Sequence, residues 1–218
     1  MEKYGEIPPR FTKAWWGYFW EYYRWYVLGT SLALFLLIMT VFQCAHRPKY
    51  DATIVYAGHM AYSDTEVQRL TELASEYIPD IDGNGKNSIF FQPLIFSDGA
   101  GNEEFDYAIQ TKLDLTFVDS DAYIYLMDET EAALYMRRDT IDEMFEPVTS
   151  FSDSGDTLAG EKDGVAYALS LKDSKLLRNR EIYCDDLYIM VRVNDKTDEK
   201  NVISHENALL FAKALAEK

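Results

Sequence analysis

The clearest chemical pattern in the sequence lies in seven consecutive residues, 80–86, which read DIDGNGK. The side-chain oxygens of Asp80, Asp82 and Asn84 stand at positions 1, 3 and 5 of such a loop, and a glycine stands at position 6. The backbone carbonyl of Lys86 follows at position 7. Oxygen ligands at this spacing, around a glycine that permits the sharp turn, wrap Ca²⁺ in proteins. The sequence therefore predicts a calcium site formed by these four residues.

Later positions of the same loop depart from a complete calcium site. The first seven residues resemble EF-hand and dockerin calcium loops, but position 8 is Asn87 and position 12 is Phe91. An acid at position 12 normally completes the ligand shell, so binding would be weak unless another acid, such as Glu76, contributed. Asp, Asn and Gly also dominate tight turns for local reasons. A metal-free turn between a helix and a strand is therefore the alternative interpretation.

The other residues capable of chemistry are dispersed. Three histidines, His46, His59 and His205, are scattered and have no helical i, i+4 partner, so their spacing predicts no metal triad. The chain has no G-x-S-x-G elbow, no P-loop and no G-x-G-x-x-G motif. Paired acids such as Asp119 and Asp121 are expected by chance among 37 acidic residues. We therefore expect no enzymatic activity.

His59 is distinguished by its position. It follows Gly58 and the β-prone run Ala52–Tyr56, and so stands at the carboxyl end of a predicted first strand. In open α/β sheets, ligands bind outside such strand ends. Two interpretations follow, a ligand contact and, more simply, a solvent-exposed loop histidine.

An apolar stretch places all these residues relative to a membrane. Residues 25–45 carry no charge over 21 positions, roughly 30 Å of helix, which is enough to cross a bilayer. Residues 1–24 are rich in Trp and Tyr, which prefer the membrane interface, and carry four Lys/Arg, against two soon after the stretch. The sequence therefore predicts a cytoplasmic and interfacial segment (1–24), a transmembrane helix in the lipid bilayer (25–45) and an extracellular domain (50–218).

The charge of the domain restricts its partners. Residues 1–49 carry six Lys/Arg and three Asp/Glu, so a whole-chain net charge of −16 leaves about −19 beyond them. An acidic surface repels nucleic-acid phosphates and anionic lipid headgroups. We therefore expect no nucleic-acid partner.

Patterning beyond residue 50 alternates strands with helices. Capping boxes are predicted at Ser63 with Glu66, Asp128 with Glu131 and Thr140 with Glu143. Short helices are expected after the last two, and a loop is expected at 150–160. The longer helices are predicted from Ser63 to Pro79, over Glu103–Val118, where a strand is the alternative, and from Ser204 onward. The strands are predicted at Ala52–Tyr56, Ile89–Leu94, Ala122–Met127, Val165–Leu169 and Leu187–Val193. This order predicts an α/β fold with a single, mainly parallel sheet covered on both faces.

Several segments together resemble a known group of proteins. These are FWEYYRWYVL before the apolar stretch, then YDATIVYAG, DIDGNGK, DSDAYIYLMD and DGVAYALSL. In this order they resemble uncharacterised signal-anchored membrane proteins of Gram-positive, clostridia-like bacteria, whose outer domains are similar to one lobe of type 2 extracellular solute-binding proteins. The resemblance implies a periplasmic-binding-protein-like lobe.

From the anchor and this resemblance we expect a membrane-anchored, non-enzymatic binding or interaction module of the cell envelope. Its partner would be a small molecule or an envelope protein. The resemblance implies one alternative, a tethered solute-binding accessory subunit of a transporter.

Overall fold

The computed structural model describes residues 9–45, 50–81, 83–97, 102–119, 121–153, 155–195 and 197–217. These residues belong to two compact units, Met1–Pro48 and Lys49–Lys218. Each unit is described by itself, because their relative placement is not determined.

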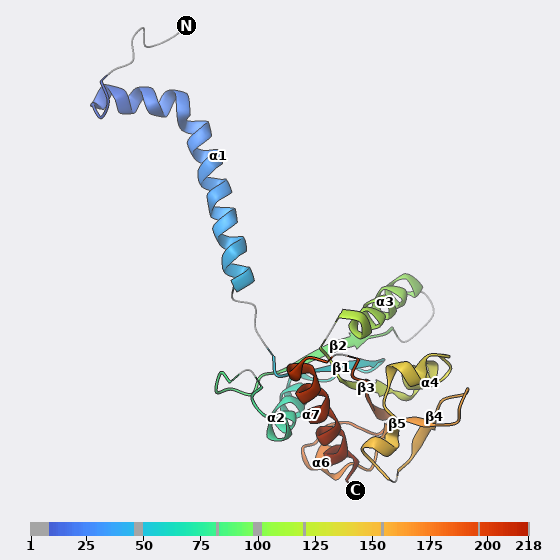
Figure 1. Cartoon of the computed structure of the whole chain (residues 1–218). Coiled ribbons are helices and arrows are strands. Elements are labelled where there is room, and N and C mark those ends of the chain that lie inside the picture. The colour runs from blue at the N-terminus through green and yellow to red at the C-terminus, as the bar shows by residue number, and fades with distance from the viewer. Residues whose placement is uncertain are drawn as a thin grey trace. The chain divides into compact units, whose positions relative to one another are not determined.

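The described part of the first unit is mainly one long helix, α1 (Lys13–Ala45), which contains residues 13–24 of the predicted interfacial segment and the whole predicted transmembrane segment. Residues Lys13–Gln43 are long and apolar enough to cross a membrane. Figure 1 shows α1 changing direction between a shorter N-terminal arm and a longer arm. In the N-terminal arm, Phe19 stacks on Trp15 at 5.3 Å and on Tyr23 at 5.5 Å between ring centroids, which makes one aromatic stripe.

The second unit is a six-stranded sheet with helices on both faces (Figure 1). Its strands are β1 (Ala52–Gly58), β2 (Ile89–Ile95), β3 (Ile124–Asp128), β4 (Thr157–Ala159), β5 (Ala166–Ser170) and β6 (Leu187–Val191). Its helices are α2 (Asp64–Tyr77), α3 (Glu103–Asp119), α4 (Glu129–Met136), α5 (Ile141–Met144), the 3-10 helix η1 (Val148–Ser150), α6 (Lys175–Asn179) and α7 (Glu199–Ala216). The predicted α/β class is confirmed.

The sheet is mixed, which corrects the prediction of a mainly parallel one. Its strand order is β2-β1-β3-β6-β5-β4. The pairs β1–β2 and β1–β3 are parallel, whereas β3–β6, β5–β6 and β4–β5 are antiparallel. The first three strands are joined by long crossover helices, which parallel pairing requires. Beyond β3 a short hairpin joins β4 to β5, and only the five-residue helix α6 lies between β5 and β6.

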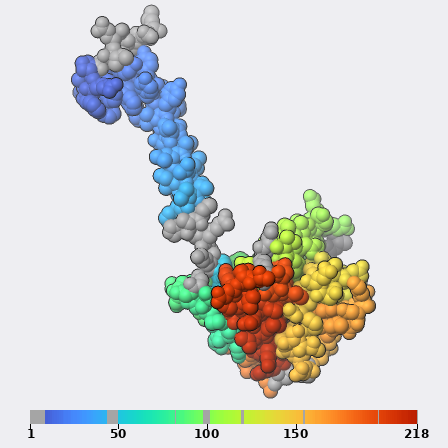
Figure 2. All heavy atoms as spheres, in the orientation of Figure 1, coloured from blue at the N-terminus to red at the C-terminus, as the bar shows by residue number. Residues whose placement is uncertain are grey.

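Alternation along the strands divides the core between the two faces. In β1, Ile54 and Tyr56 point to one face while Val55 and Ala57 point to the other, and all four are buried. Side chains of α2, α6 and α7 pack on the first face, and those of α3, α4 and α5 pack on the second. Helix α7, in red, covers much of the domain face seen in Figure 2.

Local predictions had mixed outcomes. The capping box of Ser63 and Glu66 is present at the start of α2. Thr140 makes no side-chain cap bond to α5, so that predicted box is wrong, and its hydroxyl lies 3.8 Å from the sulfur of Met144 instead. The last helix begins at Glu199 rather than Ser204, because Asp198 caps it by accepting from the amide of Asn201. The predicted loop 150–160 contains the end of η1 and the short strand β4.

Candidate functional site

The candidate site lies where the parallel strands β1, β2 and β3 end. The chain leaves β1 through α2 to reach β2 on one side, then crosses through α3 to β3 on the other side of β1. The carboxyl ends of β1 and β3 therefore flank a topological switch point, where open α/β sheets bind ligands. Because Ala57 pairs with Met127, the next residues, Gly58 and Asp128, stand side by side at this edge.

His59 and Asp128 are joined by two hydrogen bonds across this point. The backbone amide of His59 donates to Asp128 Oδ2 at 2.8 Å, and the imidazole Nδ1 lies 2.7 Å from the same oxygen. The other oxygen, Oδ1, accepts the amide of Glu131 at 2.9 Å and so caps α4. Asp128 thus orients the histidine ring and also caps α4. Because Asp128 is the last residue of β3, the site is attached directly to the sheet.

Glycine at position 58 permits this close approach. A Cβ there would lie 2.5 Å from the Tyr56 hydroxyl oxygen and 3.0 Å from Asp128 Oδ2. Burial, and then the negative charge of Asp128, raises the pKa of the Tyr56 hydroxyl. Tyr56 therefore stays protonated beside the site.

Glu131 is the most unusual residue at this edge. It is only 3 % exposed, and its Oε2 is buried without a hydrogen-bond partner. Burial is the main cause that raises its pKa to about 7, and the negative charges of Asp128 and Asp106 raise it further, while His59 lowers it. Glu131 is therefore a buried acid that changes protonation near neutral pH.

A third carboxylate, from α3, completes the cluster. Asp106 Oδ1 accepts the amide of Ser97 at 2.8 Å and Oδ2 accepts the Ser97 hydroxyl at 2.6 Å. These bonds lower the pKa of Asp106, so it is ionised at neutral pH. Phe96 directly follows β2 and precedes Ser97, and its ring centroid lies 5.8 Å from that of His59. Groups after all three parallel strands thus meet at one edge.

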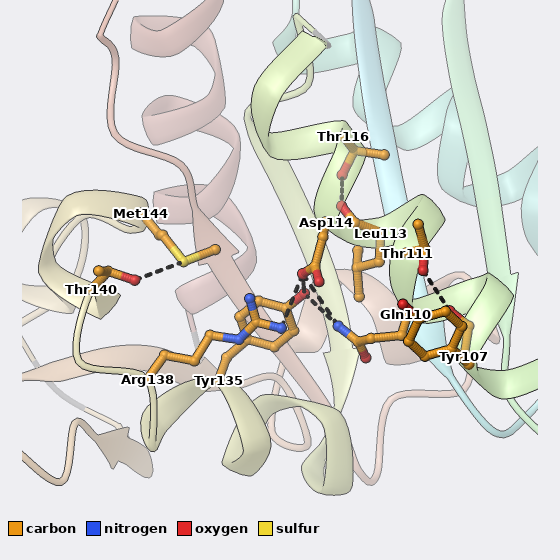
Figure 3. A network of polar contacts seen from close by, with 10 residues as sticks. All are labelled: Tyr107, Gln110, Thr111, Leu113, Asp114, Thr116, Tyr135, Arg138, Thr140 and Met144. Atoms are coloured by element: carbon orange, nitrogen blue, oxygen red, sulfur yellow. Dashed lines mark hydrogen bonds and ion pairs between the residues drawn. The ribbon is translucent and has the colours of Figure 1, made fainter. Parts of the chain in front are cut away.

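A polar network beside the site joins α3 to α4 (Figure 3). Asp114 Oδ1 accepts from the Tyr135 hydroxyl at 3.1 Å and from the Gln110 amide at 3.3 Å, and it pairs with Arg138 at 3.0 Å. The Arg138 guanidinium also lies 4.1 Å from the centre of the Tyr135 ring. This network holds together the two helices that carry Asp106 and Glu131.

The predicted calcium loop lies at the opposite, amino edge of the sheet. Asp80 accepts the backbone amides of Gly83 and Asn84 through Oδ1 and that of Gly85 through Oδ2. The side-chain oxygen of Asn84 accepts the amide of Lys86 at 2.8 Å. Asp82 lies outside the described residues.

Neighbours of this loop support it as a structural connection. Asn87, at position 8, donates through its amide to the carbonyls of Ser75 and Ile78 and so caps the end of α2. Glu76, the substitute acid, pairs with Arg180 at 2.6 Å. Among the described residues, no group of three His, Cys, Asp or Glu side chains is placed to hold a metal ion. Calcium binding stays a prediction, since its pattern uses Asn and carbonyl oxygens as well.

The remaining candidate residues are separate from the site. His205 on α7 lies 3.2 Å from Glu146, and Asp121 lies 3.9 Å from Lys200. His46 is outside the described residues. Of the two described histidines, the structure places His59 in the carboxyl-edge cluster and His205 on α7.

Sequence reasoning missed Glu131 as a site residue. The spacing of Asp128 and Glu131 predicts a capping box, and the Asp128 half of that box is present. The box pattern concerns only local backbone bonds, whereas the burial of Glu131 comes from the packing of α4 on the sheet. The sequence does contain one indication of this site: Asp128 and Glu131 come at the end of a predicted buried strand, and α/β sheets bind ligands at such strand ends.

Comparison of the chain with protein-family models, with curated proteins and with solved structures found no match. The geometry of the carboxyl edge is therefore the basis for a function.

Proposed function

We propose that this chain is a single-pass membrane protein that holds a ligand-binding α/β domain outside the cell, with its N-terminus in the cytoplasm. The domain binds a small molecule or an envelope protein and is not an enzyme. One observation carries the proposal: Glu131, Asp128 and His59 meet at the β1/β3 switch point, and one buried oxygen of Glu131 has no partner there.

Helix α1 supports the membrane anchor. Its leucine, isoleucine and phenylalanine side chains are largely exposed over several turns, a surface that water disfavours and hydrocarbon accommodates. Arg10, Lys13 and Arg24 precede the apolar part, which favours a cytoplasmic N-terminus. The aromatic stripe in the N-terminal arm suits the membrane interface.

The hydrogen bonds at the carboxyl edge support a preformed binding site. Both oxygens of Asp106 and both of Asp128 accept protein donors, so these two carboxylates hold the edge in one arrangement. His59 has a side chain 31 % exposed and fixed in direction by Asp128, as a recognition contact requires. At the amino edge, calcium held at residues 80–86 would serve to fix the connection between α2 and β2.

The test is a thermal-shift screen of the full-length chain in phosphatidylcholine nanodiscs, with sugars, amino acids and amines as probes. We expect at least one solute to raise the melting temperature, and His59→Ala to abolish that shift. His205→Ala is the matched control, because His205 lies on α7 beside Glu146. A panel with no stabilising solute would contradict small-molecule binding.

Topology has its own test in intact cells. Protease added outside should remove the domain and leave α1 in the membrane. Complete protection of the domain would overturn the extracellular placement.

A further inference from the structure

The hydrogen bonds at the carboxyl edge indicate the kind of ligand that would fit there. Asp106 accepts two donors from Ser97. Asp128 accepts the His59 amide and ring on one oxygen and the Glu131 amide on the other. Among the described acids of this cluster, Glu131 is the one with a buried oxygen, Oε2, that has no donor. Burying such an acceptor costs free energy, so a ligand that supplies one donor there would recover it.

The charges around Glu131 determine whether that ligand is a cation or an anion. Facing it are Asp128 from the end of β3, Asp106 from α3, His59 after β1 and Arg138 after α4. Arg138 is already paired with Asp114 at 3.0 Å. The first turn of α3 adds two further acids, Glu103 and Glu104. The local field therefore favours a cation and repels phosphates and carboxylates.

The number of acceptors distinguishes an organic cation from a metal ion. Metal ions need several ligands, and the described residues contain no group of three His, Cys, Asp or Glu side chains placed to hold one. A protonated amine needs less, because one carboxylate forms a charge-assisted hydrogen bond with it. An anion is not needed at the N-terminus of α4 either, since Asp128 already caps that helix.

We propose that this edge of the sheet binds the protonated amine of a small organic cation, which donates a hydrogen bond to Glu131 Oε2. The inference rests on the proposed binding function and names its ligand class. Binding requires the carboxylate form of Glu131, which has a pKa of about 7 in the free protein. The amine therefore displaces a proton, and its affinity rises with pH by about tenfold between pH 6 and pH 8.

The test is isothermal titration calorimetry on the full-length chain in phosphatidylcholine nanodiscs. The probe is 1,4-diaminobutane, which stays protonated over this pH range, and 1,4-butanediol is the uncharged probe of matched length. We expect the diamine alone to bind, with proton release seen as a different heat in two buffers of unequal ionisation enthalpy. Glu131→Gln should weaken binding at least tenfold at pH 8 and remove the pH dependence. Glu129→Gln, on the exposed side of the same helix turn, is the control and should bind normally.

The possible results distinguish failure of the amine assignment from failure of the proposed binding function. Diamine binding that Glu131→Gln leaves unchanged overturns the assignment to Glu131. Binding of a sugar or amino acid in the thermal-shift screen without any amine binding overturns the inference and leaves the proposed function standing. No binding by any probe overturns the inference together with small-molecule binding, and leaves an envelope protein as the partner of the proposed function. Circular dichroism of Glu131→Gln establishes folding, and the pH dependence of the wild-type chain tests the same point without any substitution.

Discussion

Two equally buried carboxylates lie at opposite edges of the sheet. Asp51, just before β1 at the amino edge, is 3 % exposed, and so is Glu131 at the carboxyl edge. Asp51 accepts the amide of Ile81 at 2.8 Å on Oδ1 and that of Ser88 at 2.7 Å on Oδ2, which fixes both ends of the 81–88 loop to the sheet. Glu131 has a buried oxygen with no such donor. The difference separates a carboxylate that stabilises the fold from one that costs stability, and the second is the one to which we assign the ligand.

The same change, acid to amide, should have opposite effects at the two edges. Asp51→Asn replaces an acceptor oxygen with an NH₂ group that faces a backbone amide. We expect a loss of about 3 kcal/mol in the free energy of unfolding, because a buried hydrogen bond to a charged group is removed and a donor is left unpaired. Urea denaturation at pH 7 measures it. A loss below 1 kcal/mol would show that the two edges do not differ in this way.

Glu131→Gln should instead stabilise the protein at high pH. The pKa of Glu131 is about 7 in the folded chain, above its ordinary value of 4.5. The contribution of Glu131 to the free energy of unfolding is therefore fully present below pH 4.5. In the wild type this free energy falls by about 3 kcal/mol as the pH rises through 7. The glutamine variant lacks this loss and should be the more stable chain at pH 9 but not at pH 4. Parallel denaturation curves across this range would contradict the raised pKa.

Asp128→Ala tests how far the carboxyl edge depends on its capping residue. We expect a loss of about 1–2 kcal/mol, since α4 loses its N-cap and the His59 ring its hydrogen bond. Removing the Asp128 charge should also lower the pKa of Glu131, which reduces the pH dependence of stability. Thermal unfolding at several pH values follows both effects. Unchanged pH dependence would show that Asp128 does not act on Glu131.

The smallest expected change is at the calcium-like loop. Asp80→Ala removes an acceptor of three backbone amides on an exposed loop, at a cost of about 1 kcal/mol. If calcium binds, calorimetry with CaCl₂ should show heat for the wild type and none for this variant. Equal heats from the two chains would remove the calcium site and leave the turn as the complete explanation of the sequence pattern.

Features set by neighbouring residues were predictable from the sequence. The capping box at Ser63, the β1 strand and the end of α2 before Pro79 all follow from local propensities. The buried face of α7, with Phe211 and Leu215, follows from its helical spacing. Such features depend on short-range geometry, which the sequence contains directly.

Features set by long-range packing were not predictable in this way. The direction of β6 beside β3 depends on how the chain returns after α6, and strand composition does not record it. Asp51 and its partner Ser88 are 37 positions apart, and no pattern links them. The sequence indicates the position of His59 at a strand end. The burial of Glu131 depends on the packing of α4 against the sheet, which the sequence pattern does not show.

The two outer strands of the sheet bear on how copies of the domain would behave when crowded by the membrane anchor that we propose. Edge strand β2 contains Pro93, which has no N–H to offer a further strand. The opposite edge is β4, only three residues long and irregular in register between Leu158 and Ala159. Short, interrupted edges resist pairing between sheets. Tethered domains confined to two dimensions would therefore collide often without joining into continuous sheets.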